Sequence, residues 1–127
     1  MILDWNEQLG LRFYRLSSNI FPWASEYNLS DLPDYDQIVE VLADCGDFAD
    51  RHGHRLTSHP GPFNKLTSPT EQVVLNTIKD LEIHGQVFDL MGLPRTPYAK
   101  INIHVGAHYN DKSLALGNFC RNFDRLS

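Results

Sequence analysis

The segment AKINIHVGA, residues 99–107, alternates apolar and polar side chains up to His104 and then breaks at Gly106. Such alternation is typical of a β-strand, and the glycine marks its end. We therefore predict a strand over residues 99–105. A long helical segment precedes this strand, so the order of strand and helix elsewhere in the chain decides the fold class.

Two strand–helix units precede this strand. Residues 11–18 form an aromatic-rich run that ends in small polar residues, which favours a strand leading into a loop. Residues 34–52 carry apolar side chains at spacings of three and four, which predicts an amphipathic helix stopped by Gly53. A second strand is predicted over residues 55–59, since Pro60-Gly61-Pro62 cannot continue it.

Two further helices complete the pattern. The sequence Ser68-Pro69-Thr70-Glu71 predicts the start of a long helix, because it offers a capping serine, a proline for the first helical position and a glutamate in capping-box register. A last helix, capped by Asn110 or Asp111, follows the third strand. Strands separated by helices imply right-handed crossovers and a parallel sheet.

The length of the chain limits the fold class. A complete (β/α)8 barrel needs about 250 residues, and this chain has 127. We predict a partial TIM barrel of about three consecutive βα units, a single incomplete domain over residues 1–127. The alternative is a small three-layer sheet that is complete as it stands. Bare sheet edges favour self-association or a second chain that completes the barrel.

Composition and charge exclude several classes of protein. With 42% hydrophobic and 21% charged residues the chain is not disordered, and a net charge of −5 excludes a DNA-binding surface spread over the whole chain. Cys45 and Cys120 lie in apolar-periodic segments without a CxxC or CxxH partner. They predict two buried, reduced thiols in a cytoplasmic protein, and a disulfide between them is the minor alternative. No targeting or membrane-spanning segment is found.

Two histidines end neighbouring predicted strands. His59 and His104 lie at carboxyl ends, where parallel α/β proteins bind ligands, and adjacent strands are about 4.8 Å apart. Imidazole is a common ligand of zinc and manganese, so the pair predicts a metal site. The competing interpretation is two loop histidines that bond to backbone. The nearby carboxylate of Asp111 is better explained as a helix cap.

The remaining histidines carry weaker signals. His52 and His54 flank Gly53 and are expected to face solvent, His84 is expected to be structural, and His108 lies in a loop that could touch a ligand. No P-loop, GxGxxG, GxSxG or HExxH pattern occurs, which leaves hydride transfer and nucleotide hydrolysis by those devices unsupported.

Several segments together resemble the UV damage endonuclease family. They are LRFYRLSSNIFPWAS at 11–25, SHPG at 58–61, HVG at 104–106 and YNDK at 109–112. Their order and spacing agree with the family, and the resemblance covers nearly the whole chain. It implies a TIM barrel related to the endonuclease that acts at abasic sites. It also implies cleavage of DNA on the 5′ side of UV photoproducts by a cluster of divalent metals, commonly manganese.

The resemblance also implies roles for particular residues. His59 and His104 match metal-binding histidines of the family. Pro62 and Phe63 stand where the family inserts a probing pair, usually Gln-Tyr, into the damaged duplex. Phe63 can still stack on a base, whereas Pro62 lacks an amide side chain. Lys112, at the start of the last helix, is expected to hold a DNA phosphate. Further DNA contacts are expected from Ser18, Asn19 and Tyr109.

The chain also departs from the family pattern. Nothing before Leu11 fits the family's first strand, and the family's glutamate, aspartate, histidine and modified lysine ligands lie on strands later than Ser127. We therefore expect this polypeptide alone not to nick UV-irradiated DNA. The alternatives are a non-catalytic truncated or split barrel fragment, or another metal-dependent TIM barrel such as an abasic-site endonuclease relative or a sugar isomerase.

Overall fold

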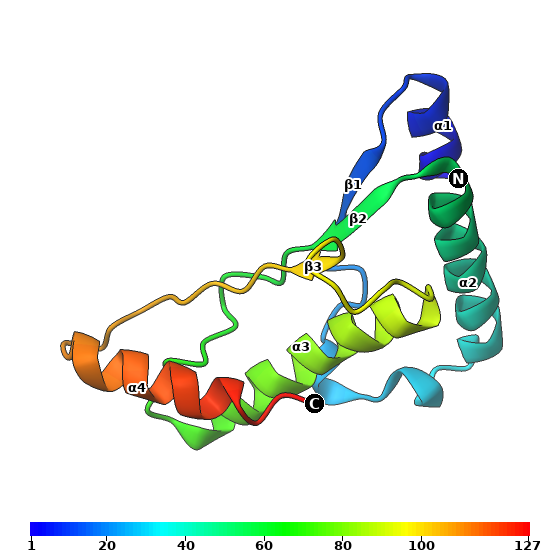
Figure 1. Ribbon diagram of the computed structural model, residues 1–127. Coiled ribbons are helices and arrows are strands. Elements are labelled where there is room, and N and C mark those ends of the chain that lie inside the picture. The colour runs from blue at the N-terminus through cyan, green and yellow to red at the C-terminus, as the bar shows by residue number, and fades with distance from the viewer.

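The computed structural model describes residues 1–127 as an α/β structure (Figure 1). Its helices and strands are α1 (Ile2–Gln8), β1 (Phe13–Leu16), α2 (Tyr35–His52), β2 (Arg55–Ser58), α3 (Glu71–Leu90), β3 (Lys100–Ile101) and α4 (Lys112–Phe123). Two short 3-10 helices, η1 (Ala24–Glu26) and η2 (Leu29–Asp31), lie in the connection between β1 and α2. None of the helices is both long and apolar enough to cross a membrane.

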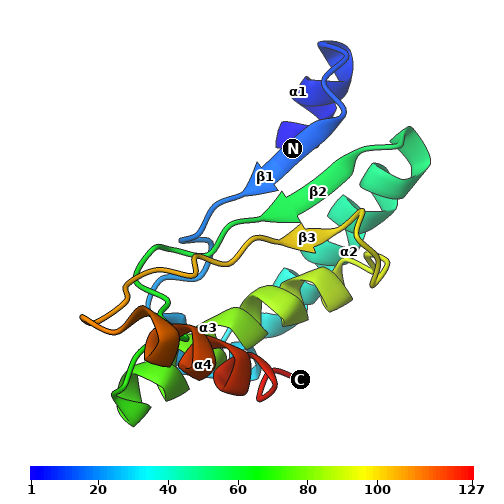
Figure 2. The same cartoon turned by 60° about the vertical axis from the view of Figure 1, so that its left-hand side comes forward.

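The three strands form a parallel sheet in the order β1-β2-β3, as the sequence predicts. Phe13 pairs with Arg55 in register, and Thr57 pairs with Lys100. Right-handed crossovers that advance in one direction place their helices on the same face of a sheet. In Figures 1 and 2 the helices do lie on one side of the strands, so the three-layer alternative is wrong.

The hydrophobic core lies between the sheet and this layer of helices. It contains Leu16 and Leu56 of the strands, Leu42 and Ala49 of α2, and Val87 of α3. The remaining core residues are Leu3, Ala24, Leu29, Ile83, Phe88 and Met91. The core fixes the carboxyl ends of β1 and β2, from which the candidate site is built.

The helix α2 begins and ends close to its predicted bounds. Gly53 terminates it with a φ of 66°, in the left-handed region that glycine adopts at no steric cost. Within the helix, Gly46 lies against the backbone of Met91, just past the end of α3. A Cβ atom on Gly46 would lie 1.7 Å from the carbonyl oxygen of Met91. The close approach of the two helices therefore requires glycine at this position.

The third strand is much shorter than the sequence predicts. Only Lys100 and Ile101 are in strand conformation, and the last ladder bond runs from the N–H of Asn102 to the carbonyl of Ser58, at 2.9 Å. The residues that follow Ser58 are not in strand conformation, so residues 102–105 have no strand to pair with. The alternating pattern predicted the position of this strand, but its length depended on how far β2 extends.

Two smaller predictions were also wrong, and one short helix was not predicted. The long helix begins at Glu71 rather than at Pro69, because Oγ of Ser68 accepts a hydrogen bond from the N–H of Thr70 and so closes a separate turn. The helix α1 was not predicted, since seven residues carry little periodicity. Both cysteines are free, but Cys120 is exposed and Cys45 is half-buried, so the expected pair of buried thiols is not found.

Candidate functional site

The polar ends of the three strands meet at one edge of the sheet. The strands run in the same direction (Figure 2), so Ser17, His59 and Asn102 follow them on the same side. Of the residues that the sequence singles out, His59 and His104 are brought into direct contact. Their rings stack with centroids 4.4 Å apart and planes inclined by 24°. The sequence placed these two histidines on neighbouring strands, and the structure joins them although His104 lies beyond the paired part of β3.

Arg15 determines the hydrogen bonding of this histidine pair. Nη1 of Arg15 lies 3.2 Å from Nδ1 of His59. A guanidinium only donates, so Nδ1 of His59 is the acceptor and the ring carries its proton on Nε2. In this arrangement the lone pair on Nδ1 of His59 is engaged by Arg15.

The pair lies in the wall of a small pocket of about 300 Å³. Arg15, Ser18, Gly61 and Pro62 line the same pocket, so residues of the loops after β1 and β2 share it with the histidines. No group of three or more histidine, cysteine, aspartate or glutamate residues in the chain is arranged to hold a metal ion. The two imidazoles are thus suitable as part of a donor set and do not complete one.

Beneath this edge, His84 supports the end of β2. Its Nδ1 lies 2.8 Å from Oγ of Ser58, and both side chains are buried. Burial lowers the pKa of His84, while the nearby carboxylate of Asp80 opposes this shift. A neutral, buried histidine that bonds to the residue before His59 agrees with the structural role expected for it.

A second cavity, of about 700 Å³, adjoins the first. It lies between the loops after β1 and β2, with the amino-terminal half of α3 as its floor, and Asn19, Pro62 and Phe63 are among its lining residues. Phe63 is 90% exposed and Trp23, on the opposite loop, is 81% exposed. No role was predicted for Trp23 from the sequence, although an aromatic residue in a loop just after a strand was a usable signal.

The loop from His104 to α4 carries the other predicted DNA contacts. Asp111 caps α4 by accepting a hydrogen bond from the N–H of Leu114, as predicted, and Lys112 is exposed at the first helical position. Tyr109 is exposed and has a φ of 48°. Neither Lys112 nor Tyr109 lines the pocket that holds the histidine pair.

Lys65, for which no role was predicted, also contacts this loop. The side chain of Lys65 lies across Gly106, so that a Cβ on Gly106 would come within 2.8 Å of both Cδ and Nζ of Lys65. The ion pairs of the chain include no lysine. Lys65 therefore places a positive charge that no carboxylate neutralises beside Gly106, which is two residues after His104 in the sequence.

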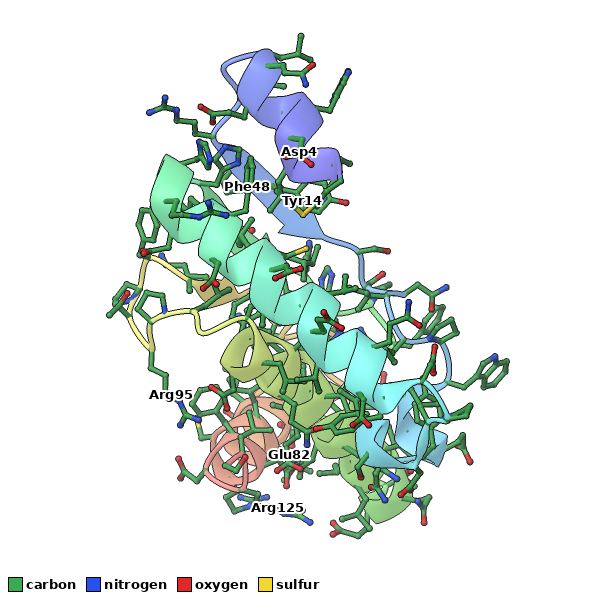
Figure 3. The ribbon with its side chains drawn as sticks, turned by 90° about the vertical axis from the view of Figure 1, so that its right-hand side faces the viewer. Asp4, Tyr14, Phe48, Glu82, Arg95 and Arg125 are labelled. Atoms are coloured by element: carbon green, nitrogen blue, oxygen red, sulfur yellow. The ribbon has the colours of Figure 1, made fainter.

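The expectation for His54 was wrong. Its side chain is fully buried, and Nε2 lies 2.7 Å from Oε2 of Glu7. Phe48 of α2 packs against the rings of both His52 and His54, at the end of α2 nearest α1 (Figure 3). These groups lie at the amino end of β2, away from His59, so they belong to the scaffold.

Comparisons with known proteins agree on one family. A sequence profile described as UV-endonuclease UvdE matches residues 1–127. The chain is 44% identical over 132 aligned residues to the UV-damage endonuclease of Neurospora crassa, which covers 99% of this chain and 19% of that protein. With the UV-damage endonuclease of Schizosaccharomyces pombe it shares 34% identity over 128 residues, covering 99% of this chain and 21% of that protein.

A solved structure shows the same fold. The chain is similar to the crystal structure of SacUVDE, with a TM-score of 0.85 and 36% identity over 99% of this chain and 42% of that one. The predicted fold class, consecutive βα units of a partial TIM barrel with a parallel sheet, is confirmed by this likeness. The chain spans less than half the length of SacUVDE and about a fifth of the length of the two fungal proteins.

Proposed function

The chain belongs to the UV-endonuclease UvdE family, and we propose that it forms part of a metal-dependent enzyme that incises DNA on the 5′ side of UV photoproducts. The partner is UV-damaged duplex DNA. The observation that carries this proposal is the stacking of His59 on His104 at the carboxyl edge of the sheet, 4.4 Å apart.

In this proposal the two histidines each give one nitrogen ligand to a divalent ion, manganese by resemblance to the family. When bound, such an ion supplies an activated water and neutralises charge on the phosphate. Arg15 affects this binding because it engages Nδ1 of His59. A neutral imidazole has one free lone pair, so Arg15 and a metal ion compete for the same ring.

We further propose that the carboxylate ligands come from outside these residues. The chain by itself, a single incomplete barrel domain over residues 1–127, then holds the ion weakly and does not incise. Both outer strands, β1 and β3, pair on one side only. A second chain, or a second copy of this one, adds to these edges and completes the barrel.

The DNA contacts in this proposal are local, as the net charge of −5 requires. The exposed ammonium of Lys112 and the free N–H groups at the start of α4 bind a phosphate. Lys65 adds a second positive charge near His104. Phe63 is free to stack on a base beside Pro62, because its ring is almost completely exposed. The polar side chains of Ser18, Asn19 and Tyr109 make further contacts with the DNA.

The proposal is tested by measuring Mn²⁺ binding to the whole chain, followed by paramagnetic resonance of free Mn²⁺. We expect His59→Ala and His104→Ala each to weaken binding at least tenfold. The matched control is His52→Ala, which removes an imidazole at the other end of the sheet. Binding that survives both substitutions, or that falls equally in the control, contradicts the metal site.

A nicking assay on UV-irradiated plasmid with Mn²⁺ tests activity separately. We expect no incision by the chain alone. Incision that disappears in His59→Ala would show that the chain needs no partner, while it would still support the role of the histidine.

A further inference from the structure

We infer that the cavity between the loops after β1 and β2 holds an unstacked base of the damaged DNA strand, with Trp23 stacked on it. This inference rests on the proposed function and names a base-binding residue for it. Trp23 and Phe63 line the same cavity from opposite loops, and both rings are almost entirely in solvent.

The backbone conformation around Trp23 keeps its side chain exposed to solvent. Its φ of 60° lies in the left-handed region, which bulky residues rarely adopt, and strained residues of this kind cluster at active and ligand-binding sites. The hydroxyl of Tyr27 donates to the carbonyl of Pro22 at 2.9 Å, and the N–H of Glu26 donates to the carbonyl of Trp23 at 2.9 Å. Ala24 is buried in the core. The turn is therefore fixed on both sides of Trp23, so that the indole points outward from a rigid support.

The lining of the cavity suits a base better than a phosphate. Its polar groups are the amides and hydroxyls of residues such as Asn19, Asn76 and Thr77, which can bond to the edges of a base. The one charged lining residue is Asp80, whose carboxylate accepts a hydrogen bond from Nδ2 of Asn64 at 2.6 Å. A carboxylate repels phosphate, but it can accept a hydrogen bond from a base amino group.

The cavity also adjoins the histidine pair. Ser18, Gly61 and Pro62 line both the larger cavity and the pocket that contains His59 and His104. When a base is bound in the larger cavity, the sugar–phosphate backbone of the same nucleotide therefore lies near His59 and His104. This continuity favours the strand that is cut over the complementary strand.

The two tryptophans of the chain allow a direct test. Trp5 lies on α1 and is 59% exposed. The variant Trp5→Phe leaves Trp23 as the only tryptophan, and its fluorescence reports stacking. We expect strong quenching by short oligothymidine and by a duplex that contains a thymine dimer, and little quenching by the undamaged duplex.

Affinity provides the second measurement. Stacking of a base on an aromatic ring corresponds to about 5- to 150-fold in affinity. We expect Trp23→Ala to lose that factor for the dimer duplex, Trp23→Phe to recover part of it, and the control Trp5→Ala to bind like the unsubstituted chain. 2-Aminopurine is a fluorescent base that can be placed beside the dimer in the damaged strand or opposite the dimer in the complementary strand. We expect its fluorescence to be quenched only in the damaged strand.

The outcomes separate the inference from the proposed function. If the dimer duplex binds but Trp23 is not quenched, or if Trp23→Ala and Trp5→Ala lose affinity equally, the inference is wrong and the proposed function stands. Quenching confined to the complementary strand also overturns it. If the chain binds none of these DNAs, the inference and the proposed DNA partner both fail.

Discussion

Nε2 of His54 lies 2.7 Å from Oε2 of Glu7 and so joins helix α1 to the turn before β2. Oε1 of the same carboxylate is 3.6 Å from Arg12 and 3.6 Å from His52. His54 has no exposed side-chain surface, and its Nδ1 has no hydrogen-bond partner. Glu7 therefore helps to hold the N-terminal helix to the sheet, together with Leu3 of the core.

This contact makes stability depend on pH. The hydrogen bond with His54 lowers the pKa of Glu7, although partial burial opposes the shift and Arg12 and His52 add to it. Because the folded pKa is lower than that of an unfolded glutamate, about 4.3, the contribution is fully present above that pH. It is lost as the pH falls through the folded pKa of Glu7.

We expect Glu7→Gln to destabilise the fold at pH 7 and to make little difference at an acidic pH below the folded pKa of Glu7. Urea unfolding at the two pH values measures this. Glu40→Gln, on an exposed face of α2, is the control and should change neither. A penalty for Glu7→Gln of the same size at both pH values would show that shape, rather than charge, holds α1 in place.

Gly46 and Gly85 give a matched pair of helix substitutions. Alanine at Gly46 places its Cβ 1.7 Å from the carbonyl oxygen of Met91, a backbone atom that moves only if the helices separate. We expect a loss of about 3 kcal/mol or more. Gly85, inside α3, has no atom within 4 Å of a built Cβ, so Gly85→Ala should stabilise by about 0.5–1 kcal/mol. Midpoints of urea unfolding compare the two, and equal effects would contradict the close packing of α2 on α3.

Local sequence signals predicted the parts of the fold that depend on short-range chemistry. Gly53 ends α2 and Asp111 caps α4, because a left-handed glycine and a capping carboxylate act within a few residues. The meeting of His59 with His104 was also predictable, since parallel strands share one carboxyl edge. The burial of His54 depends on Glu7, 47 residues away, and no periodicity within the turn could indicate it.

The same limit explains why the second cavity was missed. It forms where the loop at Trp23 meets the loop at Phe63, and neither loop has a pattern that fixes its path. The resemblance to the family singled out Ser18, Asn19, Pro62 and Phe63 of the cavity lining, but it gave Trp23 no role. The exposure and the positive φ of Trp23 are visible only in the folded chain.

Lys65 and Gly106 provide a test of the positive charge beside His104. Gly106 has a φ of 86°, and a Cβ there would displace the end of the Lys65 side chain. If Lys65 contacts a DNA phosphate, Lys65→Gln should reduce the slope of log affinity against log salt concentration by about 1. Gly106→Ala should act in the same direction. Lys100→Gln, on β3 rather than on the loop, is the control, and an equal effect there would indicate a diffuse rather than a local contact.

Because Arg15 contacts His59, we expect that removing the positive charge of Arg15 changes the affinity for Mn²⁺. Nδ1 of His59 is occupied by the guanidinium at 3.2 Å, so a metal ion must displace Arg15 before it can use that lone pair. Arg15→Met keeps most of the length of the side chain but removes both donor and charge. Because Arg15 is exposed, the contact is screened by solvent and its removal should raise Mn²⁺ affinity modestly, by about fivefold. Arg12→Met, which removes a charge that pairs with Glu7 instead, should leave the affinity unchanged. A fall in affinity in Arg15→Met would mean that Arg15 orients the ring for the ion rather than competing with it.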